Sequence, residues 1–291
     1  MLMSIADEPC RFACVPAVRY GTVPGVEPRA AALRLDLLIP ERPAGGRSPV
    51  VLHFHGGGWS EGTASSALYP WYNPLLAANG FITAAVTYRL SRFAPFPAQL
   101  HDAKAAVRWM RAHADEYGID TNHIGVWGDS AGGHLASLLG MTGDDPELEG
   151  PCGNPGYSSL VNAVVARCAP SDFGTFHTDD ENSPASVLWM LFGGPPGERP
   201  DLTAIASPLT HVRPDRPPFL VVHGTDDETV PYKQSVALAD ALRRSGNDVT
   251  LHTVDGGHHN MREDPVLPWT DEPWTALGRE ALAFFTRHLK P

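Results

Sequence analysis

The chain contains no apolar run that approaches the roughly 20 residues needed to cross a membrane, so we expect no membrane association. A leader signature is also missing from the N-terminus. Asp7 and Glu8 occupy a region that would be basic in a secretory leader, and no apolar core follows them. The expected location is therefore cytoplasmic, or extracellular if a leader has already been removed.

Basic residues are scarce relative to acidic ones. The sequence has 22 Lys and Arg residues against 33 Asp and Glu residues, which gives a formal net charge of −11. An acidic surface repels the phosphate backbone of DNA and RNA, so we expect no nucleic-acid partner.

Cysteine is also rare, with four residues in a chain of 291. Cys10 and Cys14 have a C-x3-C spacing, but no second pair completes a zinc ribbon. The sequence does not decide whether Cys152 and Cys168 form a disulfide, because that depends on the distance between their Cβ atoms. The alternative is four free thiols.

What the sequence does contain is an ordinary globular composition, 43% hydrophobic and 19% charged. Apolar runs with the period of a strand alternate with runs that have the period of a helix, which predicts the α/β class with a mainly parallel sheet covered by helices on both faces. We expect a single domain over residues 1–291. The main strands are expected at 33–38, 50–55, 81–88, 124–128, 160–169, 219–223 and 249–254, and the main helices at 99–114, 234–245 and 276–289.

Three stretches interrupt the alternation of strands and helices. Residues 1–17 are expected to form a mobile N-terminal segment. Residues 142–159 and 173–208 are rich in Gly, Pro, Asp and Asn, and we interpret 173–208 as a lid-like insertion.

The sequence around Ser130 fits the pattern G-x-S-x-G, with Gly128 and Gly132 on either side. A β-branched run precedes the pattern and an apolar helical stretch follows it, as in a nucleophile elbow that lifts a serine Oγ above a sheet edge. A turn rich in Gly and Ser is the alternative for the motif taken alone.

A serine hydroxyl becomes a good nucleophile only when a base and an orienting acid support it. Asp226 and Asp227 follow the expected strand 219–223, and His258 and His259 follow the expected strand 249–254. The order serine, acid, histidine and the placement at the carboxyl ends of strands fit this chemistry. A solvated acidic loop and a fragment of a metal site are the competing interpretations.

A glycine run, Gly56 to Gly58, follows the expected strand 50–55. Backbone N–H groups there could stabilise the negative charge that develops on a carbonyl oxygen during acyl transfer. We expect the N–H groups of Gly57, Gly58 and Ala131 to form this oxyanion hole.

Together these motifs resemble the α/β-hydrolase superfamily, and within it the hormone-sensitive-lipase-like and BD-FAE-type esterases. The similarity is carried by the H-G-G-G-W segment at 55–59, the G-D-S-A-G-G segment at 128–133, the H-G-T-D-D-E-T-V-P segment at 223–231, and G-G-H at 256–258. The resemblance implies an α/β-hydrolase fold with a mostly parallel, eight-stranded sheet and a small lid.

The register of these motifs also implies site residues. It places the acid at Asp227 rather than Asp226, and the base at His258 rather than His259. Trp59 resembles a residue that lines the acyl side of the pocket. Phe173 is predicted to line the pocket too, with packing in the core as an equal alternative.

The predicted function is hydrolysis of short-chain carboxylic esters by Ser130, His258 and Asp227 through an acyl-enzyme. The resemblance suggests acetyl or feruloyl esters of carbohydrate, for which Trp71, Trp189 and Trp269 are candidate aromatic contacts. Arylformamidase or amidase activity with the same triad is an alternative, as is a non-catalytic binding protein with this fold. We expect no metal or organic cofactor and a small-molecule ester as the partner, and we keep a homodimer as a possible assembly.

Overall fold

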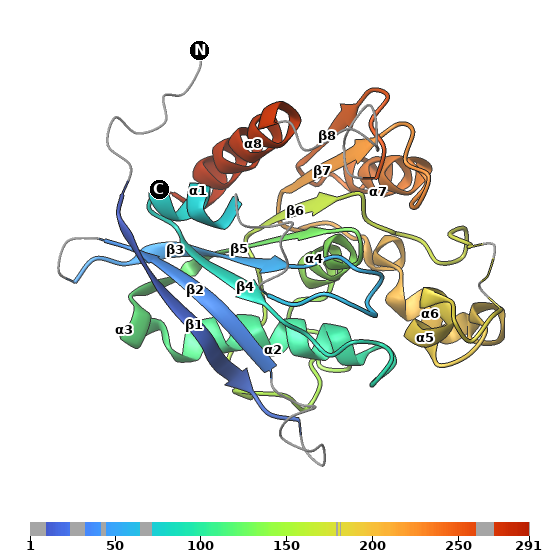
Figure 1. Cartoon of the computed structure of the whole chain (residues 1–291), viewed down its shortest axis with the longest axis horizontal. Helices are drawn as coiled ribbons and strands as arrows, with labels where there is room; N and C mark the ends of the chain where they lie inside the picture. The colour runs from blue at the N-terminus through green and yellow to red at the C-terminus, as the bar shows by residue number, and fades with distance from the viewer. Residues whose placement is uncertain are drawn as a thin grey trace.

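An eight-stranded sheet forms the centre of the molecule, with the strand order β1-β2-β4-β3-β5-β6-β7-β8. The computed structural model describes residues 10–23, 33–41, 45–64, 72–178, 180, 182–259 and 271–290, with side chains from residue 276 onward in the last segment. Strands β2 and β4 pair antiparallel, and all pairs from β4 to β8 are parallel. The expected fold, a mostly parallel eight-stranded sheet of the α/β-hydrolase type, is confirmed (Figure 1).

The strands are β1 (Phe12–Gly21), β2 (Leu33–Pro40), β3 (Ser48–Phe54), β4 (Ile82–Val86), β5 (Ile119–Asp129), β6 (Ala163–Arg167), β7 (Phe219–Gly224) and β8 (Val249–Val254). The α-helices are α1 (Tyr72–Ala78), α2 (Ala98–Ala112), α3 (Ala114–Tyr117), α4 (Ala131–Thr142), α5 (Val187–Phe192), α6 (Pro200–Ala206), α7 (Lys233–Arg244) and α8 (Asp271–Leu289). Two short 3₁₀ helices, η1 (Pro196–Glu198) and η2 (Pro208–His211), complete the described elements.

The N-terminal segment corrects one prediction. Residues 12–17, expected to be mobile, belong to strand β1, which pairs antiparallel with β2 at the edge of the sheet. Most β1 side chains are exposed, so the strand lacks the apolar alternation that identifies half-buried strands. Residues 1–9 of the same prediction lie outside the described part of the chain.

The central strands β3, β4 and β6 are buried along their whole length, because helices cover both faces of the sheet. Side chains of α2, α4 and α7 share one apolar cluster with the sheet, and side chains of α1 and α8 form a second cluster on the opposite face. Figure 1 shows α1 and α8 above the sheet and α2 and α3 below it. No helix among the described residues has the length and apolar character to span a bilayer.

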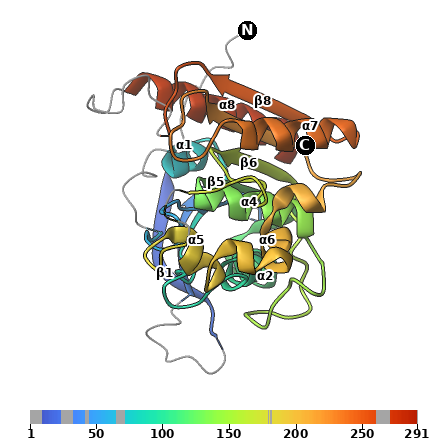
Figure 2. The same ribbon diagram turned by 90° about the vertical axis from the view of Figure 1, so that its right-hand side faces the viewer.

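The insertion 173–208 folds back over the carboxyl ends of the parallel strands. It contains α5, η1 and α6, which lie in front of α4 in Figure 2. A third apolar cluster joins the insertion to the body, with Leu188, Leu191 and Phe192 of α5 packed near Trp59 and Phe173. The insertion is therefore a packed cover over one end of the sheet.

Candidate active site

Ser130 occupies the sharp turn between β5 and α4. Its backbone angles are φ 54° and ψ −120°, a conformation that costs a non-glycine residue about 1–3 kcal/mol. The Ser130 N–H donates to the carbonyl oxygen of Arg167 at 2.8 Å, which holds the turn against β6. A Cβ atom at Gly132 would lie 2.0 Å from the carbonyl oxygen of Phe54, so only glycine lets α4 pass this close to β3.

The histidine that contacts Ser130 is His259. Its Nε2 atom lies 3.0 Å from Ser130 Oγ, and its Nδ1 atom lies 2.8 Å from Oδ2 of Asp227. The prediction of His258 is wrong, since the Nδ1 atom of His258 lies 3.1 Å from Glu228 Oε2, at the rim of the site.

The reason for this difference lies in the turn after β8. The two adjacent side chains have different partners, since His258 faces Glu228 and His259 faces Asp227, and His259 is the one that reaches Ser130. The turn is fixed by two backbone hydrogen bonds: Asp226 N–H donates to the Gly257 carbonyl, and Gly257 N–H donates to the Val254 carbonyl. A Cβ atom at Gly224 would lie 1.9 Å from the Gly257 oxygen, so the loops after β7 and β8 are in close contact. This packing sets the register and directs His259 inward.

Asp227 lies where the resemblance placed the acid, and its neighbour Asp226 is exposed. The Oδ1 atom of Asp227 accepts hydrogen bonds from the N–H groups of Thr229 and Val230, both at 2.8 Å. Oδ2 faces the rings of His259 and of His223, at 2.8 and 3.0 Å. Burial alone would raise the pKa of this carboxyl, but the hydrogen bonds from His223 and His259 hold it well below its ordinary value. The side chain is therefore ionised at neutral pH.

His223 was not predicted as a site residue, although it opens the H-G-T-D-D segment. It is fully buried, and its Nδ1 atom lies 2.6 Å from the Ser235 hydroxyl. Its Nε2 atom contacts both Asp227 Oδ2 and the Val230 carbonyl, so Nε2 carries the proton and Nδ1 accepts from Ser235. His223 thus fixes Asp227 from the side opposite His259, and its spacing of four residues from Asp227 was the signal available in the sequence.

The glycine loop after β3 lies at the same end of the sheet. Gly57 and Gly58 have positive φ angles of 106° and 54°, and both line the cavity that contains Ser130. The Gly57 carbonyl accepts hydrogen bonds from the N–H groups of Ser60 and Glu61, so this carbonyl points toward the interior of the loop. Ala131, the third expected donor, is the first residue of α4 and is buried directly after Ser130. Its N–H belongs to the first helical turn, where backbone donors have no partner within the helix.

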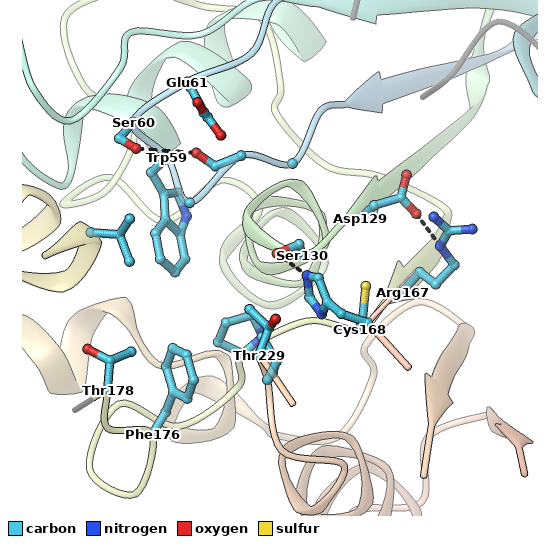
Figure 3. Close-up of a pocket in the computed structure, with 17 residues that line it drawn as sticks. Trp59, Ser60, Glu61, Asp129, Ser130, Arg167, Cys168, Phe176, Thr178 and Thr229 are labelled. Atoms are coloured by element: carbon cyan, nitrogen blue, oxygen red, sulfur yellow. Dashed lines mark hydrogen bonds and ion pairs between the residues drawn. The ribbon is translucent and has the colours of Figure 1, made fainter. Parts of the chain in front are cut away.

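The cavity around Ser130 has a volume of about 400 Å³. Trp59 and Phe176 lie on one side of Ser130, and Asp129 and Arg167 lie on the other (Figure 3). Phe173 packs behind Trp59, with ring centroids 5.8 Å apart, and is not among the residues that line the cavity. Core packing is therefore the role that the structure shows for Phe173. Phe176 lines the cavity, as had been predicted for Phe173.

Of the three other aromatic candidates, one lies in the described part of the chain. Trp189 lies on α5 and is partly buried, but it is not a lining residue. Trp71 and Trp269 lie outside the described residues.

Trp59 is held by a histidine from α4. Its Nε1–H donates to Nδ1 of His134 at 3.1 Å, and His134 Nε2 donates to the Ala206 carbonyl at 2.7 Å. Burial lowers the pKa of His134 to about 4, so the ring is neutral and serves as a structural link between α4 and α6.

Asp129 and Arg167 form a buried ion pair beside the elbow, with Arg167 Nε 2.6 Å from Asp129 Oδ1. Burial raises the pKa of Asp129, but Arg167 and His53 outweigh that effect and lower it overall. The Arg167 guanidinium also donates to the hydroxyl of Tyr72 at 3.1 Å. The pair therefore ties β5 and β6 together directly behind Ser130.

Comparison with known proteins identifies the family of the chain. Residues 35–242 match the BD-FAE family. The chain belongs to the BD-FAE family. The resemblance expected from the sequence motifs is thus confirmed, and the match extends from β2 into α7.

Known relatives of this BD-FAE chain include a mycobacterial protein. The probable carboxylic ester hydrolase LipM of Mycobacterium tuberculosis is 34% identical over 243 residues, which is 82% of this chain and 52% of that protein. The chain spans about half the length of the curated relatives it matches.

Solved structures of similar fold cover nearly the whole chain. A truncated carbohydrate esterase from gut microbiota is 28% identical with a TM-score of 0.80, covering 97% of this chain and 98% of that one. Esterase 2 of Thermogutta terrifontis with bound propionate is 26% identical with a TM-score of 0.71, covering 99% and 98%.

Proposed function

We propose that this BD-FAE protein is a serine carboxylic-ester hydrolase that acts through an acyl-enzyme. The observation that carries the proposal is the continuous chain of hydrogen bonds from Ser130 Oγ through the His259 ring to Asp227. Such a chain lets a neutral imidazole take the serine proton while an ionised carboxylate holds the ring in the required tautomer.

In the first half of the reaction, Ser130 Oγ attacks the ester carbonyl carbon as His259 Nε2 takes the hydroxyl proton. The carbonyl oxygen becomes negatively charged, and N–H groups of Gly57, Gly58 and Ala131 are the donors assigned to it. Each such donor is worth about 3–4 kcal/mol in the transition state. His259 then gives its proton to the alcohol oxygen, the C–O bond breaks, and the alcohol leaves.

The second half repeats these steps with water. His259 takes a proton from water as the hydroxide attacks the acyl carbon, and then returns a proton to Ser130 Oγ as the carboxylic acid leaves. Asp227 stays ionised in both halves and stabilises the imidazolium, for which its lowered pKa suits it.

The size of the cavity favours a short acyl group. A volume of about 400 Å³ is near the lower end for small-molecule sites. Propionate bound to the Thermogutta esterase supports a short acyl chain, and the gut carbohydrate esterase supports an esterified sugar as the alcohol. We therefore propose acetyl and propionyl esters, including those of carbohydrates, as the substrate class.

Labelling with a fluorophosphonate followed by mass spectrometry of the peptide that contains Ser130 tests the nucleophile. We expect one adduct, located on Ser130, and none in Ser130→Ala. Rates on p-nitrophenyl esters of increasing acyl length, acetylated xylan and N-formylkynurenine test the substrate class. A preference for the formamide over every ester would contradict the proposed reaction, and labelling without any Ser130 adduct would exclude the proposed nucleophile.

A further inference from the structure

A thiol lies next to the hydrogen-bonded residues of the site. Among the described residues, the potential ligand atoms of Cys168, Asp227 and His259 all lie within 4.8 Å of one another. Cys168 follows β6, lines the same cavity as Ser130, and is only 2% exposed. Figure 3 shows its sulfur directed into the space between Ser130 and Arg167. The described cysteines are all free, so this sulfur is not held in a disulfide.

We propose that Cys168, Asp227 and His259 form an inhibitory binding site for a thiophilic divalent cation such as Zn²⁺ or Cd²⁺. One thiolate, one imidazole and one carboxylate are ligands that Zn²⁺ accepts, and an ion bound by three side chains keeps a fourth position for water. Hard cations such as Mg²⁺ and Ca²⁺ prefer sites made of oxygen alone, so this donor set disfavours them.

The geometry needs only a small adjustment. Two ligands on a tetrahedral zinc ion lie about 3.3–3.8 Å apart, given bond lengths of about 2.0–2.3 Å. The His259 Nδ1 atom and Asp227 Oδ2 are already closer than this, at 2.8 Å, and the sulfur is at most 4.8 Å from its partners. Metal binding would therefore require His259 Nδ1 and Asp227 Oδ2 to move apart by about 0.5 Å and the sulfur to lie within about 3.8 Å of both.

The carboxylates of Asp129 and Asp227 act on the Cys168 sulfur and favour a cation there, while the Arg167 guanidinium opposes it. A bound metal would replace the thiol proton, which passes to solvent as the metal–sulfur bond forms. The Arg167 charge is balanced by its ion pair with Asp129.

The predicted consequence is loss of turnover, and this part of the inference rests on the proposed function. A metal at Nε2 of His259 would displace the hydrogen bond from Ser130, and a metal at Nδ1 would replace the N–H that faces Asp227. Either arrangement removes the base from the hydrogen-bonded chain.

Two measurements on the full chain test the site. Titration with Cd²⁺ or Co²⁺, followed by absorption spectroscopy, reports metal–thiolate charge transfer independently of activity. Titration with Zn²⁺, followed by the rate of p-nitrophenyl acetate hydrolysis, reports inhibition relative to the metal-free rate of each variant. Loss of an outer-shell partner typically costs 10–100-fold in metal affinity, so loss of the sulfur ligand in Cys168→Ala should raise the inhibition constant at least about tenfold.

The controls separate this site from others. Cys14→Ser removes an exposed thiol on β1 and should change neither measurement. The pairs His258–Glu228 and His252–Glu280 contain no sulfur, so a metal bound there gives no thiolate absorption. Cys168→Ser serves as a second variant if the alanine variant is unstable.

A charge-transfer band that disappears in Cys168→Ala, together with weaker inhibition, is the expected result. A band or an inhibition constant that is unchanged in both Cys168 variants would overturn the site. If no ester is hydrolysed at all, the proposed function fails, yet the band dependent on Cys168 would still appear and keep the two failures distinguishable.

Discussion

The Nε2 atom of His259 lies 3.0 Å from the Oγ atom of Ser130, although 129 positions separate the two residues in the sequence. Ser130 is placed by the turn between β5 and α4, and His259 by the loop after β8. Between those strands in the sheet lie β6 and β7, and the loop after β7 supplies Asp227. Three loops at one end of a parallel sheet thus bring nucleophile, base and acid together, as open α/β sheets place their ligands.

The choice between two neighbouring aspartates gives the first prediction. Asp227→Asn keeps the size of the side chain but removes the charge that faces His259, so kcat on p-nitrophenyl acetate should fall on the order of 10⁴-fold. Asp226→Asn is the matched control, because Asp226 is exposed and its side chain contacts Thr225. Equal losses in the two variants would contradict the assignment of Asp227.

Val187 gives a prediction about acyl length. It is the first residue of α5, it lines the cavity, and its Cγ1 atom would lie 2.8 Å from a Cβ atom at Gly58. Val187→Ala should enlarge the cavity beside the oxyanion loop and raise kcat/KM for hexanoyl over acetyl esters by about tenfold. Val187→Phe should shift the preference in the opposite direction.

Ile205→Ala, an exposed change on α6 of the same insertion, is the control and should leave the acyl-length profile unaltered. A profile that stays the same in both Val187 variants would show that α5 does not limit the acyl group.

The buried histidines predict how stability depends on pH. Burial lowers the pKa of His134 and of His55 from 6.5 to about 4, so the unfolded chain binds more protons than the folded chain between these values. The free energy of unfolding should therefore be highest above pH 6.5 and fall as the pH is lowered toward 4, by about 3 kcal/mol for each histidine.

His134→Gln tests this dependence, because glutamine does not titrate and can retain contacts with Trp59 and Ala206. Urea unfolding at about pH 7 and about pH 5 should show the wild type losing about 2 kcal/mol more than the variant. The same loss in both proteins would mean that His134 is not the titrating group.

Much of the fold could be predicted because its central strands are apolar on both faces and end at clear turns. The expected strands at 50–55, 219–223 and 249–254 agree closely with β3, β7 and β8. Strand β1 was missed for a physical reason: it is an edge strand with Pro16 in its interior and exposed side chains on both faces. An edge strand gains its stability from pairing with β2, and the local sequence carries no sign of that partner.

The sequence predicted the three loops of the site, Ser130 and Asp227, but not which histidine faces Ser130. The residue types and their order predicted Ser130 as the nucleophile, one of Asp226 and Asp227 as the acid, and one of His258 and His259 as the base. The chemistry requires these residues at the ends of strands. Which histidine turns inward depends on the contact between Gly224 and Gly257, which involves two distant loops. The roles of His223 and Cys168 depend in the same way on contacts that form only in the folded chain.

The most direct test of the account compares His259→Ala with His258→Ala, using kcat/KM for p-nitrophenyl acetate and unfolding curves to establish that both variants fold. His259→Ala should lower kcat/KM by on the order of 10⁴-fold or more, because Ser130 loses its base. His258→Ala removes only a surface contact with Glu228 and should stay within about tenfold of the wild type. A folded His259→Ala variant that keeps wild-type activity, or a larger loss in His258→Ala, would contradict the account.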